Sequence, residues 1–373
     1  MRTSVVASLA IVAVLLSGCT AGEPPAPVPG ATGDGVDAVQ AAERAAHTAT
    51  SLADGRILVA GGCVVDGCGT ASADAMVIGA DGVTVTSVAP MSVPRTNHTA
   101  NLLPDGRVVV AGGFLGEGEG VTGSIDVLDP VGATTVPAPP GTPRGGHAAS
   151  LLPDGRVLVV GGDTGTGGFT ADAEIFDPGT GAVATASPLP WAADALEATP
   201  LDDGRVLVTG GRVDGGAGTT AAALFDPDLD EWVAVGPLAV PRFKHFQVTL
   251  ADGRVLVGGG TADDRVLHAS TEVFDPDDGG FSPGPDLTQP RYKLSGGALA
   301  LADGRVLIGA GADTVELIDV AAGTSTVVEE LGTTASFATV SRLEDESALL
   351  LGGYDGRISL TGLMRVVPIP DRR

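Results

Sequence analysis

Aromatic side chains, cysteine and positive charge are all scarce in this chain. Of its 373 residues only 3% are aromatic and three are cysteine, and 21 Lys and Arg face 46 Asp and Glu, which gives a formal net charge of −25. A nucleic-acid-binding protein needs a basic surface to neutralise phosphates, and electrostatic adhesion to an anionic bilayer needs the same. The composition therefore excludes nucleic acid as a partner and charge-driven membrane binding. The 43% of hydrophobic residues suffice for a large core.

The first segment of the chain predicts export. A short positive start is followed by an apolar run at residues 5–16, which is too short to span a membrane as a mature helix. The run ends in Leu16-Ser17-Gly18-Cys19, which resembles a bacterial lipobox. The resemblance implies removal of residues 1–18 as a signal peptide and lipidation of Cys19, anchoring the protein to the bacterial cell envelope at the outer membrane or cell surface. An ordinary secretory signal is the alternative. Residues 19–40, rich in Pro and Gly, predict a flexible tether before a domain at 41–373.

One unit of roughly 50 residues recurs along this domain. The tripeptide Asp-Gly-Arg occurs six times, and a Gly-Gly pair lies seven residues after each Asp, with Ala-Gly in the sixth copy. A seventh unit lacks the tripeptide but keeps the apolar run before Gly352-Gly353. The six tripeptides stand at 54–56, 105–107, 154–156, 203–205, 252–254 and 303–305, at spacings of 51, 49, 49, 49 and 51 residues. The domain is therefore seven copies of one supersecondary unit.

Each unit predicts four strands. Asp-Gly between two apolar runs is a hairpin signal, and the second run, such as 157–160, is apolar throughout and predicts burial on both faces. A third strand ends at Asp-Pro, as in Phe176-Asp177-Pro178, and a weaker fourth strand follows. These units resemble Kelch repeats over residues 44–370. The resemblance implies an all-β fold, a seven-bladed β-propeller of four-stranded Kelch-type blades around a central channel. Residues 36–40 or residues 364–369 would complete the last blade.

Strand direction sorts the connections between strands onto two faces. The segments before each first strand and the variable loops after Gly-Gly share one face, which we call the Arg face. Recurring arginines there predict a ring at the channel mouth that binds carboxylates or sulfates of a protein or glycan. The alternative, which the recurrence itself favours, is that each Arg locks blades together. On the opposite face, the Asp residues of the turns are explained by the ordinary requirements of tight turns, and Ca²⁺ binding is the alternative. The candidate ligand-binding residues are Arg44, Arg95, Arg144, Arg212, Arg242 and Arg291.

The two cysteines of the domain and four of its histidines are predicted to have structural roles. Cys63 and Cys68 flank an Asp-Gly turn and predict a disulfide in an oxidising compartment. Four histidines lie seven residues before the hairpin Asp, where the other units have Leu196, Gly296 and Ala338; they are His47, His98, His147 and His245. Because each belongs to a different blade, we expect each imidazole to hydrogen-bond within its own blade. No metal and no other cofactor is predicted.

Enzymes built on the same propeller are the alternatives to binding. Copper radical oxidases use two Tyr, two His and a Cys crosslinked to one Tyr, but this domain has only Tyr292 and Tyr354, and Lys293 stands where a His ligand would follow. A sialic-acid mutarotase of Kelch type would suit the Arg face, although no residue singles it out. We therefore predict a monomeric, non-catalytic binding scaffold at the cell envelope, whose ligand is a protein or a carbohydrate. A Kelch-type carbohydrate-active enzyme is the alternative.

Overall fold

The computed structural model of the protein describes residues 38–344 and 346–372. The predicted signal peptide, Cys19 and most of the predicted tether lie outside the described residues. The helix α1 (Ala38–Ala42) straddles the predicted domain boundary, so residues 38–40 are helical and do not form a strand of the last blade. Within the described ranges no helix is long and apolar enough to cross a membrane.

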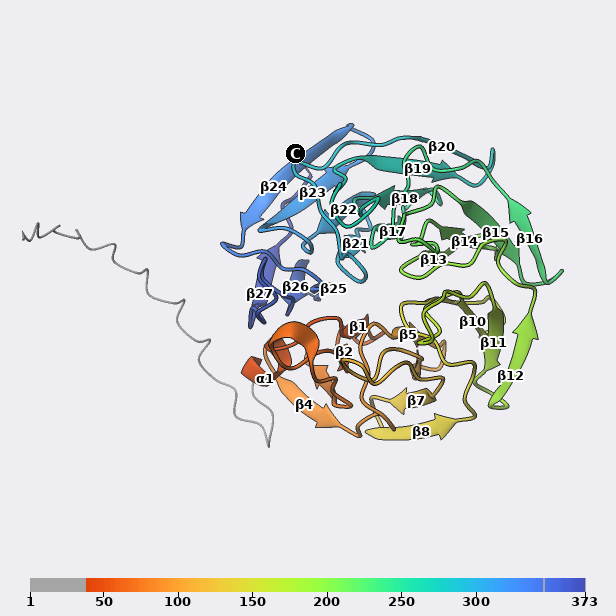
Figure 1. Cartoon of the computed structure of the whole chain (residues 1–373). Helices are drawn as coiled ribbons and strands as arrows, with labels where there is room; N and C mark the ends of the chain where they lie inside the picture. The colour runs from red at the N-terminus through yellow and green to blue at the C-terminus, as the bar shows by residue number, and fades with distance from the viewer. Residues whose placement is uncertain (1–37, 345, 373) are drawn as a thin grey trace, which may run out of the picture.

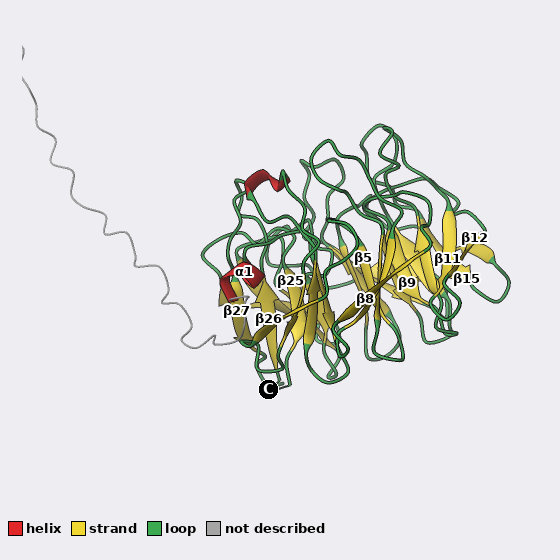
Figure 2. Ribbon diagram, turned by 90° about the horizontal axis from the view of Figure 1, so that it is seen from below, coloured by secondary structure: helices red, strands yellow, loops and turns green. Residues whose placement is uncertain are grey.

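Seven antiparallel sheets stand in a ring around a central channel, which confirms the predicted seven-bladed β-propeller (Figure 1). Seen from its edge, the ring is a single layer of strands with loops projecting from both faces (Figure 2). Six sheets have four strands each, in sequence order from the channel outward. The seventh has three strands among the described residues, and α1 packs against the third of them, β27.

The strands of the first four blades are as follows. Blade 1 contains β1 (Thr48–Ser51), β2 (Ile57–Ala60), β3 (Ala75–Ile78) and β4 (Val85–Val88). Blade 2 contains β5 (Thr99–Leu102), β6 (Val108–Ala111), β7 (Ile125–Asp129) and β8 (Thr134–Ala138). Blade 3 contains β9 (Ala148–Leu151), β10 (Val157–Val160), β11 (Ala173–Asp177) and β12 (Ala182–Ala186). Blade 4 contains β13 (Glu197–Pro200), β14 (Val206–Thr209), β15 (Ala222–Asp226) and β16 (Glu231–Ala234).

The remaining blades continue the same order. Blade 5 contains β17 (Phe246–Thr249), β18 (Val255–Gly258), β19 (Thr271–Asp275) and β20 (Gly280–Pro283). Blade 6 contains β21 (Ala298–Ala300), β22 (Arg305–Ile308), β23 (Thr314–Asp319) and β24 (Thr324–Glu330). Blade 7 contains β25 (Thr339–Arg342), β26 (Ser347–Leu351) and β27 (Met364–Pro368).

The second strand of every blade is buried along its whole length, as the uninterrupted apolar runs predict. Side chains of these strands pack against the neighbouring blade as well as their own. Leu58 of blade 1 and Val110 of blade 2, for example, belong to one cluster. The hydrophobic effect thus holds adjacent blades together, and the ring is one continuous structure with the channel at its centre.

A closed ring of main-chain hydrogen bonds surrounds the channel on the Arg face. In each blade one residue just before the inner strand has a positive φ, between 45° and 62°, and donates its N–H to the equivalent carbonyl of the preceding blade, at N···O distances of 2.7–3.3 Å. A left-handed backbone costs a non-glycine residue about 1 kcal/mol or more, so these bonds offset real strain. We call these seven residues the main-chain ring: Ala46, Asn97, Gly146, Ala195, Lys244, Lys293 and Phe337.

Candidate functional site

Five of the six candidate arginines lie inside the blades. Their exposed fractions are 0–1%, and the Nη1 atom of each donates to a carbonyl one or two residues after the second strand of its own blade, at 2.6–3.1 Å. Four of them also form an ion pair with an acid on the third strand, such as Arg95 with Asp126 at 2.7 Å. Burial lowers the pKa of Arg95 to about 10. These side chains stabilise the blades, and the candidate binding set is corrected accordingly for Arg44, Arg95, Arg144, Arg242 and Arg291.

Arg212, the sixth candidate, differs from the others. It follows the Gly-Gly pair of blade 4 and is only half-buried, with 29% of its side chain exposed. Its guanidinium donates two hydrogen bonds to Asp194, from Nε at 2.9 Å and from Nη2 at 2.6 Å. Burial raises the pKa of Asp194. Of the predicted arginines, Arg212 is therefore the one at the channel mouth.

The four aligned histidines join neighbouring blades. Each is buried, and the Nε2 atom of each lies 2.9–3.0 Å from a threonine hydroxyl of the preceding blade; the pairs are His47–Thr339, His98–Thr48, His147–Thr99 and His245–Thr209. The expectation of bonds within one blade was wrong, because each imidazole packs against the first glycine of the Gly-Gly pair of the preceding blade and so reaches a hydroxyl of that blade. Desolvation lowers the pKa of three of them, His47, His147 and His245, to about 3, so these rings are neutral at neutral pH.

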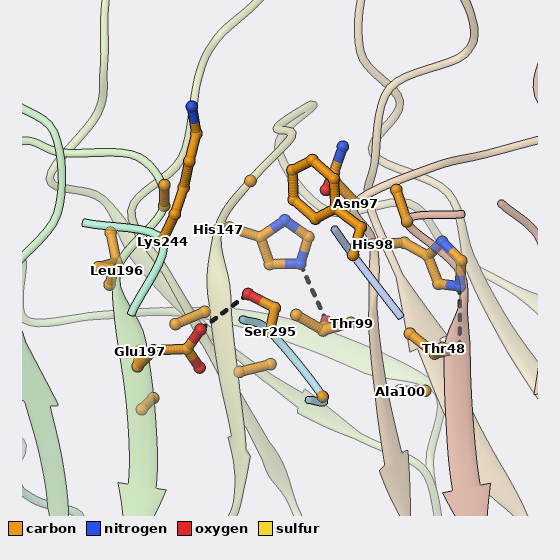
Figure 3. A pocket seen from close by; sticks show the side chains of 18 of the residues that line it. Thr48, Asn97, His98, Thr99, Ala100, His147, Leu196, Glu197, Lys244 and Ser295 are labelled. Carbon is orange, nitrogen blue, oxygen red and sulfur yellow. Dashed lines mark hydrogen bonds between the residues drawn. The ribbon is translucent and has the colours of Figure 1, made fainter. Parts of the chain in front are cut away.

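A pocket of about 410 Å³ opens from the channel on the Arg face. Six of the seven residues of the main-chain ring line it, together with side chains from the loops after Gly-Gly. Figure 3 shows its wall: the His98–Thr48 and His147–Thr99 pairs on one side, and Glu197 with Ser295 lower down. Lys244 extends away from that lower pair (Figure 3). The pocket therefore has a rim at the mouth and a floor inside the channel.

A series of alternating aromatic rings and cations reaches the rim, where three of its members, Arg212, Lys244 and Phe337, line the pocket. Every cation–aromatic contact of the described residues belongs to this single series, with the charged group 5.0–5.9 Å from each ring centroid. We call it the cation–aromatic arc; in order around the mouth it runs Phe169, Arg212, Phe243, Lys244, Tyr292, Lys293 and Phe337. It runs from blade 3 to blade 7. Apart from Arg212, its members were not predicted as site residues from the sequence.

The arc gathers side chains that are rare in this protein. The whole chain contains two lysines, Lys244 and Lys293, and both lie in the arc. They occupy the same position in blades 5 and 6, within Arg242-Phe243-Lys244 and Arg291-Tyr292-Lys293. This repeated Arg-aromatic-Lys pattern is the signal that could have identified the site.

The three cations of the arc differ in whether a carboxylate pairs with them. Arg212 is paired with Asp194, and Nζ of Lys244 lies 2.7 Å from Asp264. Lys293 has no ion pair among the described residues; its ammonium lies 5.0 Å from the Tyr292 ring and 5.4 Å from the Phe337 ring. A cation held against aromatic faces without a carboxylate is available to an anionic ligand.

The pocket floor contains an acid without a cation. Glu197 begins β13, and its Oε1 accepts a hydrogen bond from the Ser295 hydroxyl at 2.8 Å. Desolvation raises the pKa of Glu197 to about 7, against the weaker opposing effect of the Ser295 bond. No group of three or more His, Cys, Asp or Glu side chains in residues 38–344 and 346–372 is arranged to hold a metal ion.

A disulfide joins Cys63 and Cys68, whose Cα atoms are 4.9 Å apart. Its loop on blade 1 contacts the corresponding loop of blade 7: Gly67 N–H donates to the Ile358 carbonyl at 3.0 Å, and Leu360 N–H to Asp66 at 2.8 Å. Cys63 packs in one cluster with Phe337, the last member of the arc. The disulfide loop thus supports both the contact between blades 1 and 7 and one end of the arc.

No protein-family model matches the chain, and no curated protein matches it. Among solved structures, that of YjhT is similar at a TM-score of 0.59 and 14% sequence identity, covering 89% of this chain and 96% of that one. As many as 1076 chains of known structure match. A likeness at 14% identity shows the propeller fold alone, and a fold shared this widely does not select a function.

Proposed function

We propose that this protein binds a saccharide carrying an anionic group in the pocket at the channel mouth, and that it does so without chemical conversion. The observation that carries the proposal is the cation–aromatic arc on the pocket rim. Aromatic faces pack against the C–H face of a sugar ring, and ammonium and guanidinium groups hold carboxylates or sulfates. Both kinds of group reach the pocket, which Arg212, Lys244 and Phe337 line. Lys293 lies between Lys244 and Phe337 in the main-chain ring, whereas Phe243 is fully buried beside the cations.

The shape of the site supports a small ligand or a single sugar unit over a protein partner. A pocket of about 410 Å³ lies within the range of about 300–1,000 Å³ typical of small-molecule sites. A protein partner would instead need a broad contact surface of several hundred Å² per side. As part of the same proposal, the Leu16-Ser17-Gly18-Cys19 motif would hold this Kelch-type propeller at the bacterial envelope, where such glycans are exposed.

Calorimetric titration with glucuronate and glucose tests the proposal, because the two sugars share a ring and differ by one carboxylate. We expect the protein to bind glucuronate more tightly than glucose. Lys293→Met keeps the unbranched apolar part of the side chain and removes its charged end. It should weaken glucuronate binding about tenfold, as the loss of one charged hydrogen bond of about 1.5 kcal/mol predicts. Phe337→Leu should weaken both sugars.

Arg156→Met is the matched control, since it removes one positive charge from the opposite face, where Arg156 pairs with Asp154. It should leave both affinities unchanged. Equal affinity of the wild-type protein for the two sugars, or a Lys293→Met protein with unchanged preference, would contradict the proposal. Conversion of the added sugar, or faster exchange between its anomers in NMR spectra, would replace binding by catalysis.

A further inference from the structure

Glu197 has an unusual position among the acids of the pocket. Two carboxylates of the described residues line it, Asp194 and Glu197, and Asp194 is paired with Arg212. Glu197 has no ion pair among the described residues, and its one hydrogen bond from a side chain comes from Ser295. A carboxyl group in a partly enclosed site normally has a cation or several donors as partners. Glu197 thus has unused acceptor capacity facing a cavity.

Ser295, the hydrogen-bond partner of Glu197, lies in an insertion that only the repeat of blade 6 contains. In six blades the Asp position of the hairpin lies eight residues after the main-chain ring residue, for example Asp252 after Lys244. In blade 6 it lies ten residues after, from Lys293 to Asp303, so blade 6 has two extra residues. The extra residues place Ser295 and Gly296 in the channel before β21 begins. Counting back from the hairpin Asp had placed Gly296 at the position of the aligned histidines. In the structure Leu294 occupies that position and is buried against Gly259. The insertion therefore supplies a hydroxyl to the pocket floor, opposite blade 4.

The surroundings of Glu197 offer little to neutralise it. The inner strands β9 and β17 on either side carry no titratable side chain. The titratable groups that line the same pocket are His47, His98 and His147, the Asp194–Arg212 pair and Lys244. Lys244 is bound to Asp264 and points toward the rim (Figure 3). The floor is thus an isolated acceptor beside a hydroxyl, and the cations are at the rim.

We propose that Glu197 and Ser295 receive hydroxyl or amine donors of the ligand at the pocket floor, so that the protein selects a bifunctional ligand with its anionic group at the arc. This inference rests on the proposed function and adds the determinant of specificity. When ionised, Glu197 accepts donors from a sugar more strongly than when protonated. Because burial places its pKa at about 7, the preference for a hydroxylated ligand should rise with pH across neutrality.

Two ring compounds that each carry one carboxylate distinguish recognition at the pocket floor from recognition at the rim. Glucuronate and cyclohexanecarboxylate both carry a ring and one negative charge, but only the first has hydroxyl donors. We expect the wild-type protein to prefer glucuronate, with an affinity ratio that grows several-fold from pH 6 to pH 8. Repulsion between Glu197 and the ligand charge affects both compounds and cancels in the ratio. Glu197→Gln should lower the ratio at pH 8 about tenfold, the worth of a charged hydrogen bond, and make it independent of pH.

Ser295→Ala provides a second variant that keeps the carboxylate, and it should lower the ratio less. Glu119→Gln, on the exposed loop of blade 2, is the matched control and should behave as wild type. Thermal melting shows that each variant is folded. An unchanged ratio and pH profile in Glu197→Gln, with glucuronate still dependent on Lys293, would overturn this inference alone. A wild-type protein that binds neither compound would overturn the proposed function as well.

Discussion

Replacing His245 by Leu should make the propeller less sensitive to acid. His245 is fully buried between blades 4 and 5, and its Nε2 lies 2.9 Å from the Thr209 hydroxyl. Two other blades already use leucine at this position, because Leu196 and Leu294 pack against Gly161 and Gly259 in the same way. Thr209 keeps a second partner in Gln247 at 2.6 Å. We therefore expect His245→Leu to fold, and to lie within about 1 kcal/mol of the wild type at pH 7.

The pH dependence follows from the pKa of His245. Burial, and then the charge of Arg242, lower it from 6.5 to about 3, so the native protein holds this ring neutral at pH 5 while the unfolded chain protonates it. The unfolded state then binds more protons, and stability is lost as the pH falls below 6.5. For one such group the loss between pH 7 and pH 5 is about 2 kcal/mol. His245→Leu removes that contribution, so the variant should lose about 2 kcal/mol less than the wild type.

Urea unfolding at pH 7 and pH 5, followed by Trp fluorescence, measures the difference. His268→Asn is the control: His268 is only partly buried and its Nε2 lies 3.0 Å from the Pro241 carbonyl, so its replacement should change the pH dependence less. Carboxylates titrate in both proteins and cancel in the comparison. A His245→Leu protein whose free energy of unfolding falls with acid as steeply as that of the wild type would refute this account of a buried neutral imidazole.

The propeller could be predicted from the sequence because local and global signals agree in every unit. Asp-Gly predicts the hairpin in six of the seven units, and the apolar run after the hairpin, present in all seven, predicts a strand buried on both faces. Outer strands give a weaker signal. In β12, for instance, three of the five residues are exposed, and the pattern lacks a buried stripe. The composition of the last blade was therefore left open, and its described part consists of three strands with α1 beside them.

The role of the arginines could have been read from the sequence by comparing blades. In blade 4 the Arg position is Ala193, and the acid position on the third strand is Ala223. In their place Trp191 donates its Nε1–H to the Gly210 carbonyl at 3.0 Å, the atom that Arg contacts elsewhere. Joint loss of Arg and acid in blade 4 indicates that the two side chains pair with each other and not with a ligand. Blade 1 keeps Arg44 with Met76 at the acid position, so there the main-chain carbonyl is the partner that remains.

The sequence signals part of the arc through the repeated Arg-aromatic-Lys pattern, but the assembly of the complete arc and of the floor could not be predicted, for different reasons. Arc residues come from five blades and from two kinds of segment, and nothing in one unit indicates that Phe169 reaches Arg212 in the next. Glu197 and Ser295 are 98 positions apart, and the two-residue insertion in blade 6 shifts the alignment at the decisive point. Contacts between repeats require the geometry of the closed ring.

Two further predictions test the packing of the blades. Arg95→Leu leaves Asp126 buried without its cation and should lower the free energy of unfolding in urea by about 3–5 kcal/mol. Arg107→Leu removes an exposed ion pair with Asp105 and should lower it by less than about 1 kcal/mol. Similar losses in the two variants would contradict the structural role of Arg95. Gly112→Ala should destabilise by more than about 2 kcal/mol, because its φ is +59° and its Cβ would lie 2.5 Å from the His147 ring and 2.8 Å from the Arg144 carbonyl. Gly106→Ala shares the positive φ, at +88°, but its Cβ would meet nothing within 4 Å, so it isolates the conformational cost. If both glycine variants lose the same stability, backbone conformation alone explains the Gly-Gly pair, and the close approach of neighbouring blades does not.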